Sequence, residues 1–297
     1  MKKERQKTKD EILYEKETGK YAIWRGVVSE GFEKWLKRKG LDLFKIDHIK
    51  NETNDNMKIY CDDGDSLVVR NIKSINEIED LGTRAELRVL DLSDNQISEI
   101  TNLDGLVKLK HLCLSDNKIS EIKGLEKLKN LKALRLSGND ITEIKGLEKL
   151  KNLEMLLLRH NKITELKGLD CLKNLTYLDL TGNCITEVKG LENLKSLKKL
   201  VLEENQISKI TNFGNLPNLT ELSLYKNKIK KVEGLEGLIN LNELFLEENN
   251  IAEINDLSVF PPNLKFLSLH PNPISLLGNP NEDQFLKIYE KYEEPYD

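Results

Sequence analysis

The stretch Leu87-Arg88-Val89-Leu90-Asp91-Leu92-Ser93-Asp94-Asn95-Gln96-Ile97 decides the fold of this chain. It reads L-x-x-L-x-L-x-x-N-x-I, and the same pattern returns in residues 175–185. The asparagine of this pattern occurs nine times, and the spacing is 22 residues except for a last spacing of 23. A pattern that repeats in fixed register predicts a stack of similar coils, which is a solenoid. The nine asparagines are Asn95, Asn117, Asn139, Asn161, Asn183, Asn205, Asn227, Asn249 and Asn272.

The alternation inside the pattern predicts one short β-strand in each coil. Leu90 and Leu92 point to one side, and Val89, Asp91 and Ser93 point to the other. One coil cannot bury its leucines alone, so the strands must stack about 4.8 Å apart into a parallel sheet. After each strand the chain bends and leaves backbone groups without strand partners. A primary amide both donates and accepts, so we expect an inward asparagine ladder to satisfy those groups.

A second repeated position predicts a left-handed turn on the side opposite the sheet. Seven residues after each ladder asparagine stands a glycine, asparagine or aspartate, the residues that best tolerate a positive φ. Leucine or phenylalanine follows directly and again three residues later, which predicts a short helical or 3₁₀ return segment. The turn positions are Asn102, Gly124, Gly146, Gly168, Gly190, Asn212, Gly234 and Asp256.

Composition narrows the class of protein. Charged residues make up 32% of the 297 residues, yet the net charge is only −4, so no basic field favours nonspecific nucleic-acid binding. The sequence has no apolar core of a secretory signal at its start and no run of about 18 apolar residues, so we predict a cytoplasmic protein without membrane contact. The four cysteines lack paired spacing and predict reduced thiols: Cys61, Cys113, Cys171 and Cys184.

The two ends of the chain depart from the repeat. Residues 1–66 predict a charged arm and a small α/β module, including a hairpin around the acidic turn 61–65. Residues 67–86 resemble the return segment of a coil whose strand is missing, so we expect them to cap the first coil of the repeats, which span residues 87–274. Residues 275–297 predict an amphipathic helix over the last coil. The helical face of Phe32 and Trp35 fits either packing on the module's strands or an exposed partner site.

The form I-x-x-I-x-x-L-x-x-L between ladder asparagines, closed by Asn272-Pro273-Ile274 and an aromatic helix, resembles one leucine-rich repeat subclass. Its type member is the nuclear regulatory subunit of type-one protein phosphatase, and the resemblance covers about residues 70–292. Bacterial internalins share the repeat length, but the missing signal sequence argues against them. The resemblance implies an α/β solenoid, a right-handed horseshoe of nine repeats with a parallel concave sheet. It also implies a non-catalytic protein that binds another protein in that sheet, for instance as a regulatory subunit.

The outward residues of the strands are the candidate partner site. A strand face that meets only water would carry threonine, lysine and glutamate, whereas this one also carries an aromatic and aliphatic track beside carboxylates. The carboxylates would steer a partner with a basic or mixed apolar and basic surface, or they serve only as solubilising residues. The predicted contact residues are Met155, Leu157, Tyr177, Val201, Glu203, Glu221, Tyr225, Glu243, Phe245, Glu247 and Phe266.

The sequence gives little support to an enzyme. The four histidines lie far apart, none beside a recognisable nucleophile motif, and no glycine loop could cradle a phosphate. We therefore expect no catalytic residues, no cofactor and no metal, and a chain that is a monomer by itself. Two alternatives to the scaffold stay open: repeats that carry an N-terminal ligand-binding or catalytic module, and a nucleic-acid binder.

Overall fold

The structure, a computed structural model, describes residues 58–62, 65–210, 213, 216–254 and 257–273. These residues all belong to one compact unit within residues 53–297. The charged arm, most of the predicted N-terminal module and the predicted C-terminal cap helix lie outside the described residues. Of the module, only the hairpin around residues 61–65 is described.

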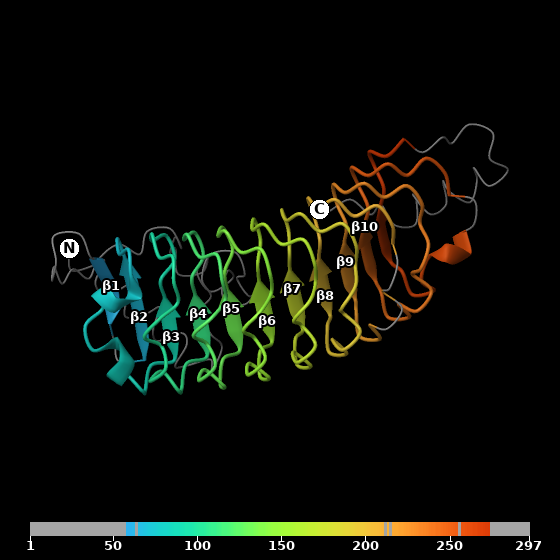
Figure 1. The fold of residues 1–297 in the computed structure, drawn as a ribbon. Coiled ribbons are helices and arrows are strands. Elements are labelled where there is room, and N and C mark those ends of the chain that lie inside the picture. The colour runs from blue at the N-terminus through green and yellow to red at the C-terminus, as the bar shows by residue number, and fades with distance from the viewer. Residues whose placement is uncertain (1–57, 63–64, 211–212, 214–215, 255–256, 274–297) are drawn as a thin grey trace, which may run out of the picture. The chain divides into compact units, whose positions relative to one another are not determined.

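The described chain forms one sheet of 11 strands whose spatial order follows the sequence (Figure 1). Strands β1 and β2 are antiparallel, and every later strand pairs in parallel with the strand before it. The nine strands that the sequence predicts are β3 to β11. The strands are β1 Lys58–Asp62, β2 Ser66–Arg70, β3 Val89–Asp91, β4 His111–Cys113, β5 Ala133–Arg135, β6 Met155–Leu157, β7 Tyr177–Asp179, β8 Lys199–Val201, β9 Glu221–Ser223, β10 Glu243–Phe245 and β11 Phe266–Ser268.

The hairpin before the repeats is confirmed, but its second strand belongs to the solenoid. Strand β2 pairs with β3 in parallel, with Ser66 opposite Val89, and its Leu67 and Val69 are fully buried. The expectation that the first coil lacks its strand is therefore wrong. The reason is a shorter bend: four residues separate Leu92 from Ile97, whereas two separate Val69 from Ile72. The asparagine of this bend, Asn71, follows Val69 by two residues, whereas Asn95 follows Leu92 by three.

The asparagine ladder is confirmed at all nine positions. In a typical coil, Asn117 Nδ2 donates to the carbonyl of Leu114 in its own coil and to that of Leu92 in the coil before, at 3.1 and 2.8 Å. Its Oδ1 accepts the N–H of Ile97 at 2.9 Å. The ladder begins with Asn95, which bonds Val69 and Ile72, and ends with Asn272, which bonds Leu246 and Ile251. Each bend is therefore fixed by an amide from the following coil.

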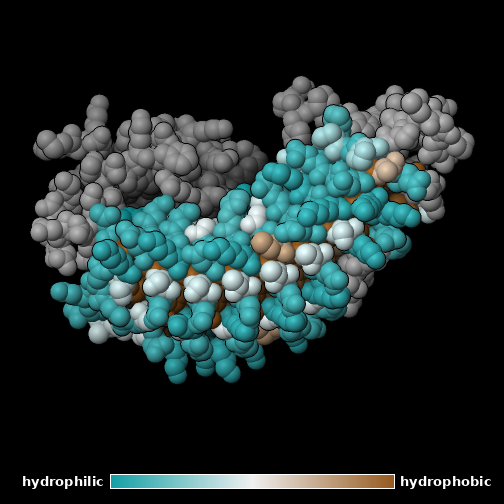
Figure 2. All heavy atoms as spheres, turned by 45° about the horizontal axis from the view of Figure 1, so that its top comes forward, coloured by the Kyte–Doolittle hydropathy of each residue, from teal (hydrophilic) through white to brown (hydrophobic). Residues whose placement is uncertain are grey.

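The core is a continuous column of leucine and isoleucine between the sheet and the return segments. The leucine in the middle of each strand from β3 to β11 is buried, as are most apolar residues of the return segments. On the face seen in Figure 2, hydrophilic residues form rows from coil to coil, and the apolar residues show only as narrow strips between them. Most return segments are single turns, as where Leu106 N–H donates to Leu103 O at 3.0 Å. The 3₁₀ helices are η2 Ile75–Glu77, η3 Leu81–Thr83 and η4 Leu257–Val259.

The left-handed turns are confirmed wherever the predicted position is described. Asn102 has φ 58°, and the five described glycines at this position have φ from 71° to 87°. A second left-handed position, directly before the ladder asparagine, was missed because only Gly138 and Gly182 among its occupants are glycine. The others are Asp94, Asp116, His160, Glu204, Lys226 and Glu248.

Replacing Gly168 by alanine should destabilise the solenoid by about 1–3 kcal/mol, the usual cost of a strained backbone. Gly168 has φ +87°, and a Cβ atom there would lie 1.9 Å from the carbonyl oxygen of Ile144 in the coil before. The added methyl group must therefore push two coils apart. Denaturant unfolding of Gly168→Ala measures this loss, with Lys167→Ala at the neighbouring exposed position as control. Equal midpoints for the two variants would contradict the close approach.

Candidate functional site

The candidate site is the outer sheet face, which we define as the side of the sheet away from the leucine core. In each coil it presents the two end residues of the strand and the residue two positions further on. The parallel register sets equivalent residues of adjacent coils side by side, such as Glu221 and Glu243. Of the aliphatic residues predicted to make contact there, Leu157 and Val201 are only 4% and 6% exposed. The accessible apolar surface is therefore narrower than the sequence indicates.

The accessible aromatic side chains on the strands of this face form two groups. Phe245 and Phe266, on adjacent strands, have ring centroids 5.1 Å apart with planes tilted by 43°. Tyr177 lies on β7, next to Met155 on β6, and Lys199 Nζ lies 5.5 Å from its ring centroid. Burial and the nearby Asp179 raise the pKa of Tyr177, so its hydroxyl stays a donor at neutral pH. The predicted track is thus two separate patches.

The carboxylates on β8 to β10 and in the bends after them differ in how well they are neutralised. Lys199 pairs with Glu221, and Glu203 accepts a hydrogen bond from the Ser223 hydroxyl at 2.8 Å. By contrast, neither Glu243 nor Glu247 makes an ion pair with any described residue, and Glu247 Oε2 is buried with no hydrogen-bond donor. These two carboxylates, which lie on β10 and two residues after it, therefore carry negative charge that no described residue neutralises.

Tyr225 lies in the bend after β9, beside these carboxylates. Its hydroxyl donates to Glu248 at 2.8 Å. This hydrogen bond raises the pKa of Tyr225. Glu248 is therefore engaged within the chain, and the tyrosine ring is held in place across two coils. A ring fixed in this way can meet a partner with little loss of rotamer freedom.

The half of the outer sheet face over β2 to β7 carries arginines, which the predicted contact residues do not include. Arg70 pairs with Asp91 at 2.8 Å, and Arg159 Nε lies 3.8 Å from Asp179. Between them Arg135, at the end of β5, is 4% exposed. The sequence does place Arg135 on this face, at the fifth position of its coil. It does not show that the neighbouring coils offer this arginine no ion-pair partner.

His111 on β4 lies in this positively charged half, and its pKa is lowered. Burial is the main cause that lowers its pKa to about 4, and the charges of Arg135, Lys110 and Lys132 lower it further. An unfolded histidine has a pKa of about 6.5. The folded state therefore binds fewer protons than the unfolded state between these two values, and its stability falls as the pH drops from about 6.5 to about 4.

Replacing His111 by glutamine should flatten the pH dependence of stability in this window. The wild-type chain should lose stability on acidification from pH 6.5 toward pH 4, and His111→Gln should lose less because it removes a group that gains a proton on unfolding. Denaturant unfolding at several pH values measures both slopes. His160→Gln is the matched control, since His160 is exposed. Parallel curves for wild type and His111→Gln would contradict the assignment.

A second asparagine ladder lies near the start of the strands and was not predicted. Each of its amides is exposed and donates to a backbone carbonyl of the coil before, as Asn152 does to Lys129 O at 2.9 Å. The pattern was hidden because Lys108 and Ser196 occupy the same position in other coils. The members are Asn130, Asn152, Asn174, Asn218, Asn240 and Asn263.

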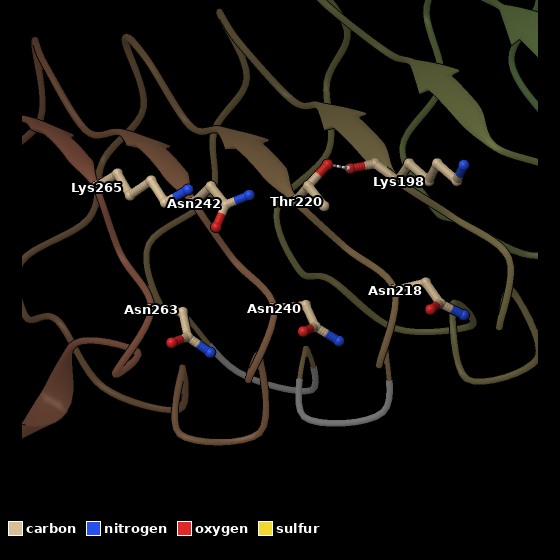
Figure 3. A pocket seen from close by; sticks show the side chains of 7 residues that line it. All are labelled: Lys198, Asn218, Thr220, Asn240, Asn242, Asn263 and Lys265. Carbon is tan, nitrogen blue, oxygen red and sulfur yellow. Dashed lines mark hydrogen bonds between the residues drawn. The ribbon is translucent and has the colours of Figure 1, made fainter.

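Three members of this second ladder line a shallow groove of about 440 Å³ (Figure 3). Figure 3 shows Asn218, Asn240 and Asn263 in one row and the other lining residues in a second row at the starts of β8 to β11. Thr220 there donates to the carbonyl of Lys198 at 3.0 Å. The lining residues are all polar and include no ion pair, so the groove offers no arrangement that indicates a catalytic or ligand-binding site. The second row is Lys198, Thr220, Asn242 and Lys265.

Within the described ranges, no three histidine, cysteine or acidic side chains come together in a way that could hold a metal ion. Cys113, Cys171 and Cys184 are free. Burial raises the pKa of Cys113 to about 11, so it is a poor nucleophile at neutral pH. None of the described helices is long and apolar enough to cross a bilayer.

The comparison with protein families agrees with the stacked coils and their ladder. Residues 66–270 match the family model described as "Leucine-rich repeat region". The chain belongs to the leucine-rich repeat family. This matched range begins at β2, which supports its place as the strand of the first coil. No curated protein matches the sequence.

Solved structures of other leucine-rich repeat proteins resemble the chain. Internalin C2 from Listeria monocytogenes is 34% identical, with a TM-score of 0.56 over 63% of this chain and 80% of that one. TLR13, solved in complex with ssRNA13, is 29% identical, with a TM-score of 0.59 over 70% of this chain and 32% of that one. The functional domain of InlJ from Listeria monocytogenes, 24% identical with a TM-score of 0.53 over 66% of this chain and 47% of that one, shows the fold alone. The internalins, set aside by the sequence analysis, therefore share this repeat fold.

Proposed function

We propose that this leucine-rich repeat protein is a non-catalytic scaffold that binds a partner protein on its outer sheet face. The observation that carries the proposal is the partly exposed pair of Phe245 and Phe266 beside Glu243 and Glu247, two carboxylates with no counter-ion among the described residues. Apolar rings on a preformed surface gain free energy when a partner covers them. Solenoids of this kind typically use an extended strand face for binding.

The chemistry of the partner follows from the charge of this region. Glu243 and Glu247 favour a partner with lysine or arginine next to an apolar side chain, and their field speeds encounter more than it adds affinity. We further infer that the chain acts as a regulatory subunit of the kind suggested by the phosphatase regulator, is cytoplasmic and is a monomer by itself. The right-handed horseshoe, the N-terminal module and the C-terminal cap helix remain part of this proposal.

The two alternatives have less support. TLR13 was solved in complex with an RNA, ssRNA13, but Glu243 and Glu247 on the aromatic end of the outer sheet face of this chain would repel phosphates. An N-terminal catalytic or ligand-binding module would lie in residues outside the described ranges. Neither alternative accounts for the partly exposed phenylalanine pair.

Affinity capture from a native lysate tests the proposal. Recovery of a stoichiometric basic protein by the wild type, and slower recovery by Glu243→Lys, supports the scaffold. Glu126→Lys is the control, because Glu126 is an exposed carboxylate outside the sheet and makes no ion pair with a described residue. Recovery of nucleic acid with a steep salt dependence, or equal capture by both variants, rejects the proposal.

A further inference from the structure

Arg135 is a buried cation with no partner inside the described chain. Its side chain belongs to the last residue of β5, in register with Cys113 on one side and Leu157 on the other. The residue is 4% exposed, and its Nε has no hydrogen-bond acceptor. Burial lowers the pKa of Arg135, which shows that the folded chain disfavours its charge. A buried guanidinium without a counter-ion lowers the stability of the fold, which suggests that Arg135 has a function.

The nearby carboxylates cannot neutralise Arg135 because other groups hold them. Asp91 and Asp179 each lie two strands away from it, about 10 Å at the usual strand spacing. Asp91 Oδ2 accepts from Arg70 at 2.8 Å. Asp179 Oδ1 accepts from the Thr181 hydroxyl at 2.7 Å, and Arg159 lies near its other oxygen. Arg135 therefore has no counter-ion among the nearby carboxylates.

The outer sheet face consequently has two poles. The excess positive charge at Arg135 lies on β5, and the excess negative charge at Glu243 and Glu247 lies beside the phenylalanine pair of β10 and β11. Five strand spacings of about 4.8 Å separate β5 from β10, which gives about 24 Å. An extended chain covers that distance in about 7 residues, and a helix in about 16.

We propose that Arg135 binds a carboxylate side chain of a partner protein segment whose basic and apolar residues lie over β10 and β11. This inference rests on the proposed function and adds the polarity of the partner: its acidic end lies over β5. The planar guanidinium matches a carboxylate with two parallel hydrogen bonds. A chain of phosphates would meet Glu243 and Glu247 at the other pole, so a mixed-charge protein segment fits both poles better than a nucleic acid.

Selection of random 20-residue peptides displayed on phage against the full chain tests this polarity. The selected peptides should carry Asp or Glu about 7 or about 16 residues from a basic and apolar cluster. Changing that acidic residue to its amide in a synthetic peptide should weaken binding to the wild type at least about tenfold. The same change should have no effect on binding to Arg135→Met. The peptide change leaves the protein untouched, so this comparison does not depend on the folding of a variant.

Arg88→Met is the matched control, since Arg88 is an exposed arginine just before β3, and it should keep the acidic preference. The melting temperature of Arg135→Met should equal or exceed that of the wild type, because a buried unpaired charge is removed. A lower melting temperature, or equal binding of the acidic and amide peptides to the wild type, would overturn the proposal. Arg135-dependent binding of a single-stranded oligonucleotide, with no such peptide selected, would overturn it too. If the selected peptides bind Phe245→Ala as tightly as the wild type, the outer sheet face is not the binding surface and the proposed function is wrong.

Discussion

Asn161→Leu should lower the free energy of unfolding by about 2–4 kcal/mol, the largest stability effect we expect from one substitution in this chain. Asn161 Oδ1 accepts the N–H of Ile141 at 3.0 Å, and leucine leaves that buried N–H without an acceptor. Two of the three carbonyls to which Asn161 donates are less affected. Leu136 O and Leu158 O also accept from Asn139 and Asn183, the next members of the ladder.

Asn152→Leu is the matched control for this prediction. Asn152 belongs to the second ladder, is exposed and donates one hydrogen bond to Lys129 O. Water can replace that bond, so its loss should cost less than about 1 kcal/mol. Denaturant unfolding of both variants measures the difference. A loss for Asn152→Leu as large as that for Asn161→Leu would show that burial of the amide is not what makes the first ladder important.

Phe245→Ala and Tyr225→Ala should each weaken binding of the captured partner at least about tenfold, about 1.4 kcal/mol. Phe245 packs against Phe266 at 5.1 Å, and the Tyr225 hydroxyl is held by Glu248. Rings that are already ordered lose little entropy on binding, so their truncation removes most of the apolar contact. Changes at Glu203, Glu221 and Glu243 should alter mainly the association rate and its salt dependence. Titration of the purified partner against each variant measures these effects.

Ile239→Ala is the matched control for the aromatic variants. Ile239 is an apolar side chain that is 52% exposed on the return side, away from the sheet. Its truncation should leave partner binding unchanged. Variants at Phe245 and Tyr225 that bind like the parent, while changes at Trp24 or Trp35 abolish capture by a folded chain, would place the functional surface in the N-terminal residues.

The repeat predicted those parts of the fold that depend only on residues in fixed register. The ladder asparagines, the buried strand leucines and the left-handed Gly168 all follow from single positions that recur. The place of β2 as the strand of the first coil was missed because its bend is shorter and Asn71 in that bend lies outside the ladder spacing. The strand prediction therefore failed only at β2, where the 22-residue spacing does not hold.

The outer sheet face was predicted less well, because burial there depends on which side chains become neighbours across coils. Leu157 and Val201 point away from the core as expected, yet neighbours cover them. The lack of a counter-ion at Arg135 could not be predicted, because it depends on the ion pairs that Arg70 and Arg159 make with the nearby carboxylates. The sequence places each residue on a face, but the pairing of charges requires the structure.

Carboxyl footprinting of the captured complex tests the central claim, that the partner covers the outer sheet face. Free and bound chains would be labelled with a carboxyl-modifying reagent, and labelling would be quantified by mass spectrometry. We predict that Glu221, Glu243 and Glu247 become protected in the complex, while exposed Glu126 and Glu143 on the return side keep their labelling. Protection confined to the return side or to residues 1–57, with Glu243 labelled as in the free chain, would contradict the account.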